Sequence, residues 1–143
     1  MSQYIHVFVR CNDEFVELFC YGRNSEFYRV MKDCAPWEKI ARLTHEQIRE
    51  ARADLIGEIE AYKSNIAENS RMISVISNWN NSIEDKLKII NKYQEGIDET
   101  KQDMDEARDT LNMLTVLLNV EAELYIGEEC GRDVSVKDIV EPR

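Results

Sequence analysis

Turn-forming residues are scarce in this chain, which has 5 glycines and 2 prolines among 143 residues. So few helix and strand breakers favour a small number of long elements. Basic residues are also few. The chain has 18 Lys and Arg but 28 Asp and Glu, which gives a net charge of -10. This excess of negative charge argues against direct binding of nucleic acid, whose phosphate backbone requires a basic protein surface. The length is typical of one compact domain.

Long apolar runs and targeting signals are absent as well. The longest apolar stretch, residues 113–120, is interrupted by Thr115 and Asn119 and is far too short to span a bilayer. The first residues lack the basic region that precedes the apolar core of a signal peptide. With 43% hydrophobic residues the chain is too apolar for intrinsic disorder. We therefore expect a soluble, cytoplasmic protein that does not bind membranes.

The sequence also lacks the patterns that support catalysis. It has no glycine-rich phosphate loop, no nucleophile elbow and no zinc-protease motif. Two histidines, His6 and His45, are too few for a recognisable metal cluster. The cysteines show no Cys-x-x-Cys spacing, and we expect them to be reduced and mostly buried; they are Cys11, Cys20, Cys34 and Cys130. These absences predict a protein that is not an enzyme and holds no metal or cofactor.

Residues 1–44 carry no net charge and are predicted to form a β-hairpin with a short helix. Apolar and aromatic residues alternate on both sides of Asn12-Asp13, a pair that tolerates the positive φ of a tight turn. A helix from Ser25 to Lys32 is expected to follow, with a polar cap at Asn24 or Ser25. If Asn12 and Asp13 form the loop, one face of the hairpin is aliphatic; it comprises Ile5, Val7 and Val9 opposite Cys20, Leu18 and Val16.

The other face of this hairpin is aromatic with a few charges. It pairs Tyr4 with Tyr21, His6 with Phe19, Phe8 with Glu17 and Arg10 with Phe15. Two interpretations stand for it. Aromatic planes and arginine are typical of surfaces that hold a base or grip a peptide, which makes the face a candidate for a nucleotide-like ligand. Alternatively, the short helix covers it. The candidate ligand residues are Tyr4, His6, Arg10, Phe19 and Tyr21.

Residues 45–126 are predicted to form a long antiparallel helical hairpin. Thr44 and Gln47 are spaced as a capping box, and Ile48 begins a seven-residue repeat of apolar residues. The repeat stops at residues 78–82, and a second one runs from Ile83 to Tyr125. A short connection makes the helices neighbours, with Asn69 expected near Asn91 and Arg52 near Arg108 and Asp109. Residues 127–143 are expected to form a loosely structured tail that docks on the hairpin or adds a strand.

At its connection the hairpin carries more apolar surface than two helices can bury. A two-helix seam covers one stripe on each helix, whereas here apolar residues surround well over half of the circumference. By helix rise alone this end lies about 50 Å from residues 1–44, too far to be covered by them. We therefore expect a homodimer or higher oligomer with a helical-bundle core. Its predicted interface comprises Met72, Val75, Ile76, Trp79, Ile83, Leu87, Ile89, Ile90 and Tyr93.

An acidic segment lies between the two ends of the second helix. It comprises Asp98, Glu99, Asp103, Asp105, Glu106 and Asp109, against which stand only Lys101 and Arg108. One interpretation is an ordinary solvated helix face. The other is a surface that docks on a basic protein in place of nucleic acid.

Together these patterns predict an α+β fold and a non-catalytic, self-associating interaction module. Its most concrete form is an inhibitor or antagonist that occupies a basic surface of a nucleic-acid-binding protein or enzyme, of the type that phages and mobile elements encode. Two alternatives remain open. One is a small-ligand module at a subunit interface, and the other is a purely structural assembly spacer.

Overall fold

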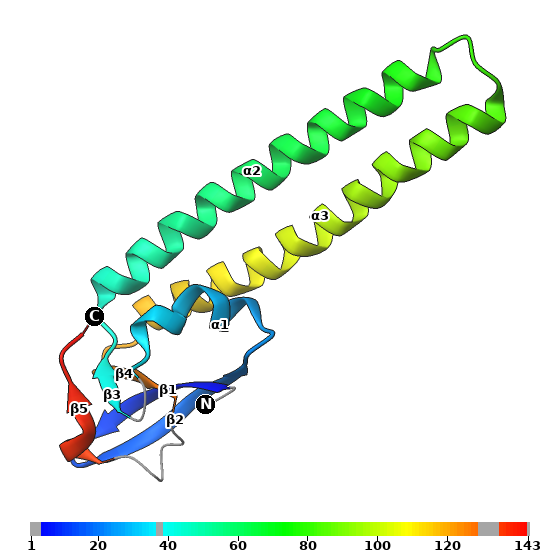
Figure 1. Ribbon diagram of the computed structural model, residues 1–143. Helices are drawn as coiled ribbons and strands as arrows, with labels where there is room; N and C mark the ends of the chain where they lie inside the picture. The colour runs from blue at the N-terminus through cyan, green and yellow to red at the C-terminus, as the bar shows by residue number, and fades with distance from the viewer. Residues whose placement is uncertain (1–3, 37–38, 129–134, 143) are drawn as a thin grey trace. The chain divides into compact units, whose positions relative to one another are not determined.

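The computed structural model describes residues 4–36, 39–128 and 135–142. It has an α+β fold, in which a mixed five-stranded sheet accompanies two long helices (Figure 1). The elements in chain order are β1 (Tyr4–Cys11), β2 (Glu14–Gly22), α1 (Glu26–Met31), a 3-10 turn (Lys32–Cys34), β3 (Ile40–Arg42), α2 (His45–Ser77), α3 (Ile83–Leu118), β4 (Leu124–Gly127), a second 3-10 turn (Val136–Asp138) and β5 (Ile139–Val140).

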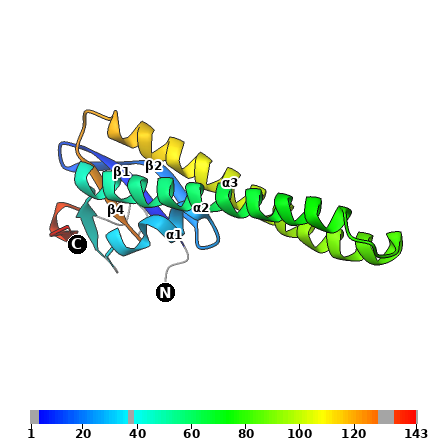
Figure 2. The ribbon, with the colours of Figure 1, turned by 90° about the horizontal axis from the view of Figure 1, so that it is seen from above.

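The chain divides into two compact units. One consists of residues 1–53 together with residues 112–143, and we call it the sheet unit. The other, residues 54–111, contains most of both long helices, and we call it the hairpin unit. The helices α2 and α3 run side by side and are joined at residues 78–82, as both views show (Figure 2). The predicted α+β class and helical hairpin are confirmed.

The sheet has the strand order β2-β1-β4-β3-β5, with β4 at its centre. All neighbours are antiparallel except β3 and β5, which are parallel. The prediction that the second helix continues to Tyr125 is wrong, because α3 ends at Leu118. The side chain of Asn119 donates to the carbonyl of Thr115, and the amides of Asn119 and Val120 make i−3 bonds that tighten the last turn. Beyond this end the chain enters β4, all four residues of which are buried.

A β-bulge changes the predicted pairing of β1 with β2. Asn12 has the positive φ expected for the turn, at 59°. From the turn to Phe8 the predicted register is correct, and Phe8 lies opposite Glu17. The register then shifts between Val7 and Phe8, so that Val7 pairs with Phe19 instead of Leu18. A bulge places two residues of one strand against one of its partner, and every later side chain on the bulged strand changes face.

Both faces of the sheet carry buried residues. Figures 1 and 2 show α1 and the adjoining turns of α2 and α3 on one side of the sheet. Tyr21, on the face shared with Ile5, stacks on Phe27 of α1 with ring centroids 4.5 Å apart. On the other face Phe8 and Tyr125 form a buried cluster with Ile40, against which Phe15 and Ile139 pack. Of the two arrangements left open for the C-terminal segment, the structure shows an added strand, because β5 pairs in parallel with β3.

Local hydrogen bonds begin the helices as the sequence predicts. The Gln47 amide donates to Thr44 Oγ1 at 3.2 Å, and the Thr44 amide donates to Gln47 Oε1 at 3.0 Å. Ser25 caps α1 by accepting from the Tyr28 amide. The second long helix, α3, is capped by Ser82, whose Oγ accepts from the Asp85 amide. Each bond satisfies a backbone donor that the first turn of a helix leaves without a partner.

The pairing of α2 with α3 differs from the predicted one. A Cβ built on Gly96 would lie 3.6 Å from Nδ2 of Asn69, so Gly96 takes the place predicted for Asn91. One turn earlier on α2, Asn65 Oδ1 accepts a hydrogen bond from Thr100 at 3.1 Å. Within the sheet unit, Arg52 donates to Thr115 Oγ1 at 3.2 Å. The pairing within the hairpin unit is therefore shifted by five residues along α3, from Asn91 to Gly96.

The predicted burial of the cysteines is wrong for two of them. Cys11 and Cys20 are exposed, and Cys34 is half-buried; Cys130 lies outside the described residues. Cys11 is the last residue of β1, and Cys20 lies on β2, which is an edge strand of the sheet. Neither long helix has an apolar stretch of the length and hydropathy that a bilayer requires, within the residues that the structure describes.

Candidate functional site

The predicted interface residues divide into a buried and an exposed group. Ile76 is fully buried inside the hairpin unit. Met72, Ile89, Ile90 and Tyr93 are half-buried. The remaining four are exposed, and we call them the apolar tip. They are Val75 (39%), Trp79 (39%), Ile83 (76%) and Leu87 (51%).

Hydrogen bonds hold the backbone at the apolar tip. The amides of Asn78 and Trp79 donate to the carbonyls of Val75 and Ile76, which closes α2 with 3-10 geometry. Across the connection, Lys86 Nζ donates to the carbonyl of Ser77 at 3.2 Å. These bonds join the end of α2 to the first turns of α3. The exposed side chains are thus presented from an ordered turn.

The charge next to the apolar tip is balanced. Glu84 and Asp85 in the first turn of α3 are followed by Lys86 and Lys88. Both acidic residues lie at the helix N-terminus, where the helix dipole favours negative charge. Because acidic and basic groups are equal in number here, two copies of the apolar tip can approach without the repulsion that the net charge of -10 implies for the whole chain.

The acidic segment lies further along α3 and all six of its carboxylates are exposed. Asp98 accepts a hydrogen bond from Gln94 at 3.0 Å. Within the part of the chain that the structure describes, none of the six forms a salt bridge. On the same unit Glu60 pairs with Lys63 and Glu68 pairs with Arg71. The hydrogen bond from Arg71 lowers the pKa of Glu68. The charges of Glu60 and Glu68 are thus each offset by a basic neighbour.

The candidate ligand residues on the sheet do not share one face. After the bulge, Phe19 and Tyr21 lie on the face of Ile5 and Val7, where Tyr21 packs on α1. Burial raises the pKa of Tyr21. The interpretation that the short helix covers these aromatics is therefore correct for Tyr21. It holds because the bulge carries Tyr21 to the helix-covered face.

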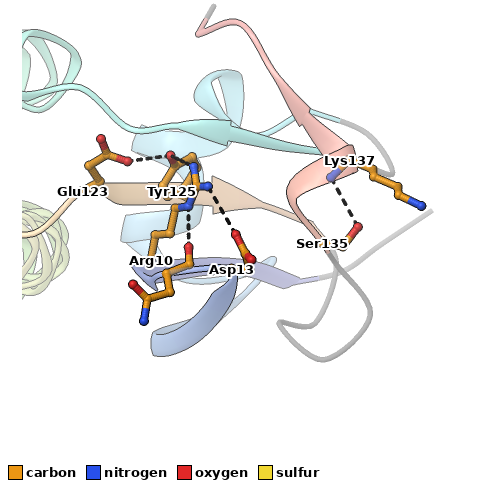
Figure 3. Close-up of polar contacts among 7 residues, drawn as sticks. Arg10, Asp13, Glu123, Tyr125, Ser135 and Lys137 are labelled. Atoms are coloured by element: carbon orange, nitrogen blue, oxygen red, sulfur yellow. Dashed lines mark hydrogen bonds and ion pairs between the residues drawn. The ribbon is translucent and has the colours of Figure 1, made fainter.

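Arg10 keeps the predicted face and enters a polar network at the end of β1 (Figure 3). Its Nε donates to the carbonyl of Asn12 at 2.7 Å, and an η nitrogen donates to the hydroxyl of Tyr125 at 3.4 Å. That hydroxyl in turn donates to Glu123 at 2.8 Å. The hydrogen bond with Tyr125 raises the pKa of Arg10. The guanidinium therefore ties the β1–β2 turn to β4, and its donors are directed at protein groups.

Tyr4 is 52% exposed and borders a shallow pocket of about 540 Å³. The lining residues follow one another where β2 leads into α1, and they are Gly22, Arg23, Asn24 and Ser25 in addition to Tyr4. Neither His6 nor Arg10 lines it. The residues that the sequence proposed for a single ligand are thus distributed over two faces and one pocket rim.

The bulge creates one grouping that the sequence analysis missed. His6 pairs directly with Cys20, and Glu17 lies one position along on the same face. The Nδ1 atom of His6 contacts Glu17 Oε1. One ligand atom from each of His6, Glu17 and Cys20 lies within 4.8 Å of the others. The only available signal was chemical, namely a histidine, a carboxylate and a thiol on paired strands, because the register that unites them depends on the bulge.

Comparison of this chain with known protein families, with curated proteins and with solved structures found no match.

Proposed function

We propose that this chain is a non-catalytic protein–protein interaction module that self-associates through the apolar tip. The observation that carries the proposal is the exposure of Ile83, at 76%, beside Leu87 and Trp79 on an ordered helical turn. Removing a large aliphatic side chain from water contributes about 1.5 to 3 kcal/mol when burial is complete. Four exposed apolar side chains, three aliphatic and one aromatic, at the connection of α2 and α3 therefore provide a driving force for association.

A second copy of the chain is the occupant that the charges favour. The first turns of α3 are electrically balanced, so like surfaces meet there at little electrostatic cost. The acidic segment has the opposite property, since six exposed carboxylates, none with a salt bridge among the described residues, repel another copy and attract a cationic surface. We assign the first surface to self-association and the second to a basic protein partner. In this arrangement the chain acts as an antagonist that competes for a nucleic-acid-binding surface.

The molar mass in solution tests self-association. Analytical ultracentrifugation of the wild-type chain over a wide concentration range is expected to show a rising mass. The Ile83→Ser variant, with a second substitution Leu87→Ser, is expected to weaken association by at least about tenfold, which is the effect of about 1.4 kcal/mol. Both positions are exposed, so the substitutions leave the folded monomer intact.

The matched control is Ile56→Ser, which replaces an aliphatic residue of the same unit that is 42% exposed and lies outside the apolar tip. This variant is expected to associate like the wild type. A wild-type chain that stays monomeric at every concentration refutes the proposal. Equal weakening by Ile56→Ser refutes the assignment of the interface to the tip.

A further inference from the structure

Three side chains with metal-binding donors lie on one face of β1 and β2. They are the imidazole of His6, the carboxylate of Glu17 and the thiol of Cys20. The His6 side chain is only 12% exposed, whereas Glu17 is 38% exposed and Cys20 is also exposed. The group therefore has one largely buried donor, His6, and two donors that solvent can reach, Glu17 and Cys20.

The β-bulge is the structural device that brings them together. Without it Cys20 would pair with Ile5 on the helix-covered face, as continuous alternation from the turn requires. The bulge inserts one residue between Glu17 and Phe19, and Cys20 then lies opposite His6. Bulges commonly redirect side chains beside functional sites. Here the redirection exposes a thiol and leaves Leu18 39% exposed at the edge of the sheet.

The ring of His6 is held in a defined orientation. It stacks on Phe8 with the ring planes 13° apart and the centroids 6.0 Å apart. Phe8 is itself fully buried in the cluster with Ile40 and Tyr125. A ligand whose side chain is already fixed loses little entropy when a metal binds.

From this arrangement we propose that His6, Glu17 and Cys20 form a zinc-binding site, a property that goes beyond the interaction function proposed above. Zinc accepts imidazole nitrogen, thiolate sulfur and carboxylate oxygen in a tetrahedral set. With bonds of about 2.0 to 2.3 Å, neighbouring donors of such a set lie about 3.3 to 3.6 Å apart. The three donors now lie within 4.8 Å, so closure requires about 1 Å of movement from the exposed Glu17 and Cys20.

Three protein ligands leave one position of the zinc tetrahedron for water or for a donor from a bound molecule. Binding requires the thiolate form of Cys20, so the thiol proton is released to solvent as the zinc–sulfur bond forms. The affinity is therefore expected to fall as the pH is lowered. Glu17, which contacts Nδ1 of His6 in the metal-free protein, supplies the negative charge that offsets the metal.

Two full-length single-thiol variants test the site. In the first, Cys11, Cys34 and Cys130 are replaced by serine, which leaves Cys20. In the second, Cys20, Cys34 and Cys130 are replaced, which leaves the exposed Cys11 as the matched control. Each is titrated with Zn²⁺ against a chromophoric chelator and separately with Co²⁺, whose thiolate charge-transfer absorption reports sulfur ligation. The Cys20 variant is expected to bind one ion and to show this absorption, and the Cys11 variant is not.

The substitutions Glu17→Gln and His6→Gln in the Cys20 variant are each expected to lower zinc affinity by at least about tenfold. Circular dichroism confirms that each variant is folded, and Glu17→Gln remains informative even where His6→Gln fails to fold, because Glu17 is exposed. The proposal is overturned if the two single-thiol variants bind zinc equally, if neither binds it, or if Glu17→Gln leaves the affinity unchanged. None of these results bears on the apolar tip.

Discussion

Gly127 illustrates how a single residue sets the distance between two strands. A Cβ built on it would lie 2.6 Å from the carbonyl oxygen of Lys39, closer than real carbon atoms approach backbone oxygen. Gly127 pairs with both His6 and Ile40 at the centre of the sheet. Glycine is needed here for the close approach of β3 and β4, because any side chain would push the strands apart.

The substitution Gly127→Ala is expected to destabilise the protein by about 1 to 3 kcal/mol, the usual cost of overpacking a site whose neighbours cannot move. Urea denaturation measures the change. Gly22→Ala is the control, since a Cβ there would make only ordinary contacts, at 3.7 Å from the ring of Tyr4. Equal effects of the two substitutions would contradict the steric explanation.

The described cysteines are predicted to differ in reactivity. Burial, and after it the charges of Asp33 and Glu50, raise the pKa of Cys34. Because the thiolate is the reactive form, Cys34 is expected to react with a disulfide reagent more slowly than Cys11 and Cys20 at mildly alkaline pH. Labelling rates followed by mass spectrometry in a Cys130→Ser background check this order.

The same pKa shift has a consequence for stability. A folded pKa above the unfolded one means that Cys34 contributes its full stabilisation below the unfolded pKa and loses it as pH rises toward the folded value. The free energy of unfolding should therefore decline at alkaline pH in part through this thiol. Cys34→Ser is expected to reduce that decline, and an unchanged pH profile would contradict the assignment.

At the scale of the element, the two long helices begin where local chemistry dictates. Thr44 and Ser82 are side-chain caps that require only a few neighbouring residues to form. Pairing between the helices is not local in this sense. It depends on the path of residues 78–82, and the structure places Gly96 beside Asn69. A polar residue at a seam position costs stability, and the adjacent small residue gives the Asn69 amide room to bond with Asn65.

Gly57 in α2 is exposed and would gain no contact from a Cβ, since no atom lies within 4 Å of that position. Glycine in a helix interior costs about 1 kcal/mol relative to alanine. Gly57→Ala is thus expected to raise the free energy of unfolding by about this amount in urea denaturation. The reverse change, Ala61→Gly one turn later on the same helix, should lower it by a similar amount.

If Gly57→Ala stabilises the isolated chain but weakens self-association in ultracentrifugation, a second chain approaches the helix at this point. If it stabilises the chain without affecting association, Gly57 plays no part in the interface. A loss of stability in the monomer would contradict the open space around Gly57.

At the scale of the whole molecule, the net charge of -10 predicts opposite salt dependences for the two proposed surfaces. Added salt screens repulsion between like copies, so self-association through the apolar tip should be retained or strengthened. Binding of a cationic probe such as poly-L-lysine should weaken as salt rises. Ultracentrifugation and fluorescence anisotropy at low and high ionic strength measure the two.

Substitutions that remove charge can distinguish binding by the acidic segment from binding that depends only on the net charge. Asp103→Asn with Asp105→Asn removes two exposed and unpaired carboxylates, whereas Glu60→Gln with Glu68→Gln removes two that are already in ion pairs. The net charge changes equally in both variants. The first is expected to weaken probe binding more strongly, and equal effects would show that only the total charge matters.

The grouping of His6, Glu17 and Cys20 in the proposed zinc site could not be predicted from the sequence. The alternation of residues predicts two strands and a turn at Asn12, but continuous alternation places Cys20 on the wrong face. A bulge is stabilised by what packs on both sides of the strand, here Tyr21 against Phe27 on one face. The packing of Phe8 against Tyr125 on the other face involves residues distant in sequence, so no local pattern predicts the bulge.

The sequence by itself determined the features that depend on near neighbours. These are the helix cap at Thr44, the positive φ of Asn12 and the apolar repeats that make two long helices, because each follows from hydrogen bonds or side-chain spacing within a few residues. Tertiary structure decided the bulge, the stagger of the helices and the central position of β4. Those depend on which of several sterically allowed pairings buries the most apolar surface, and that balance is set only when segments far apart in the chain meet.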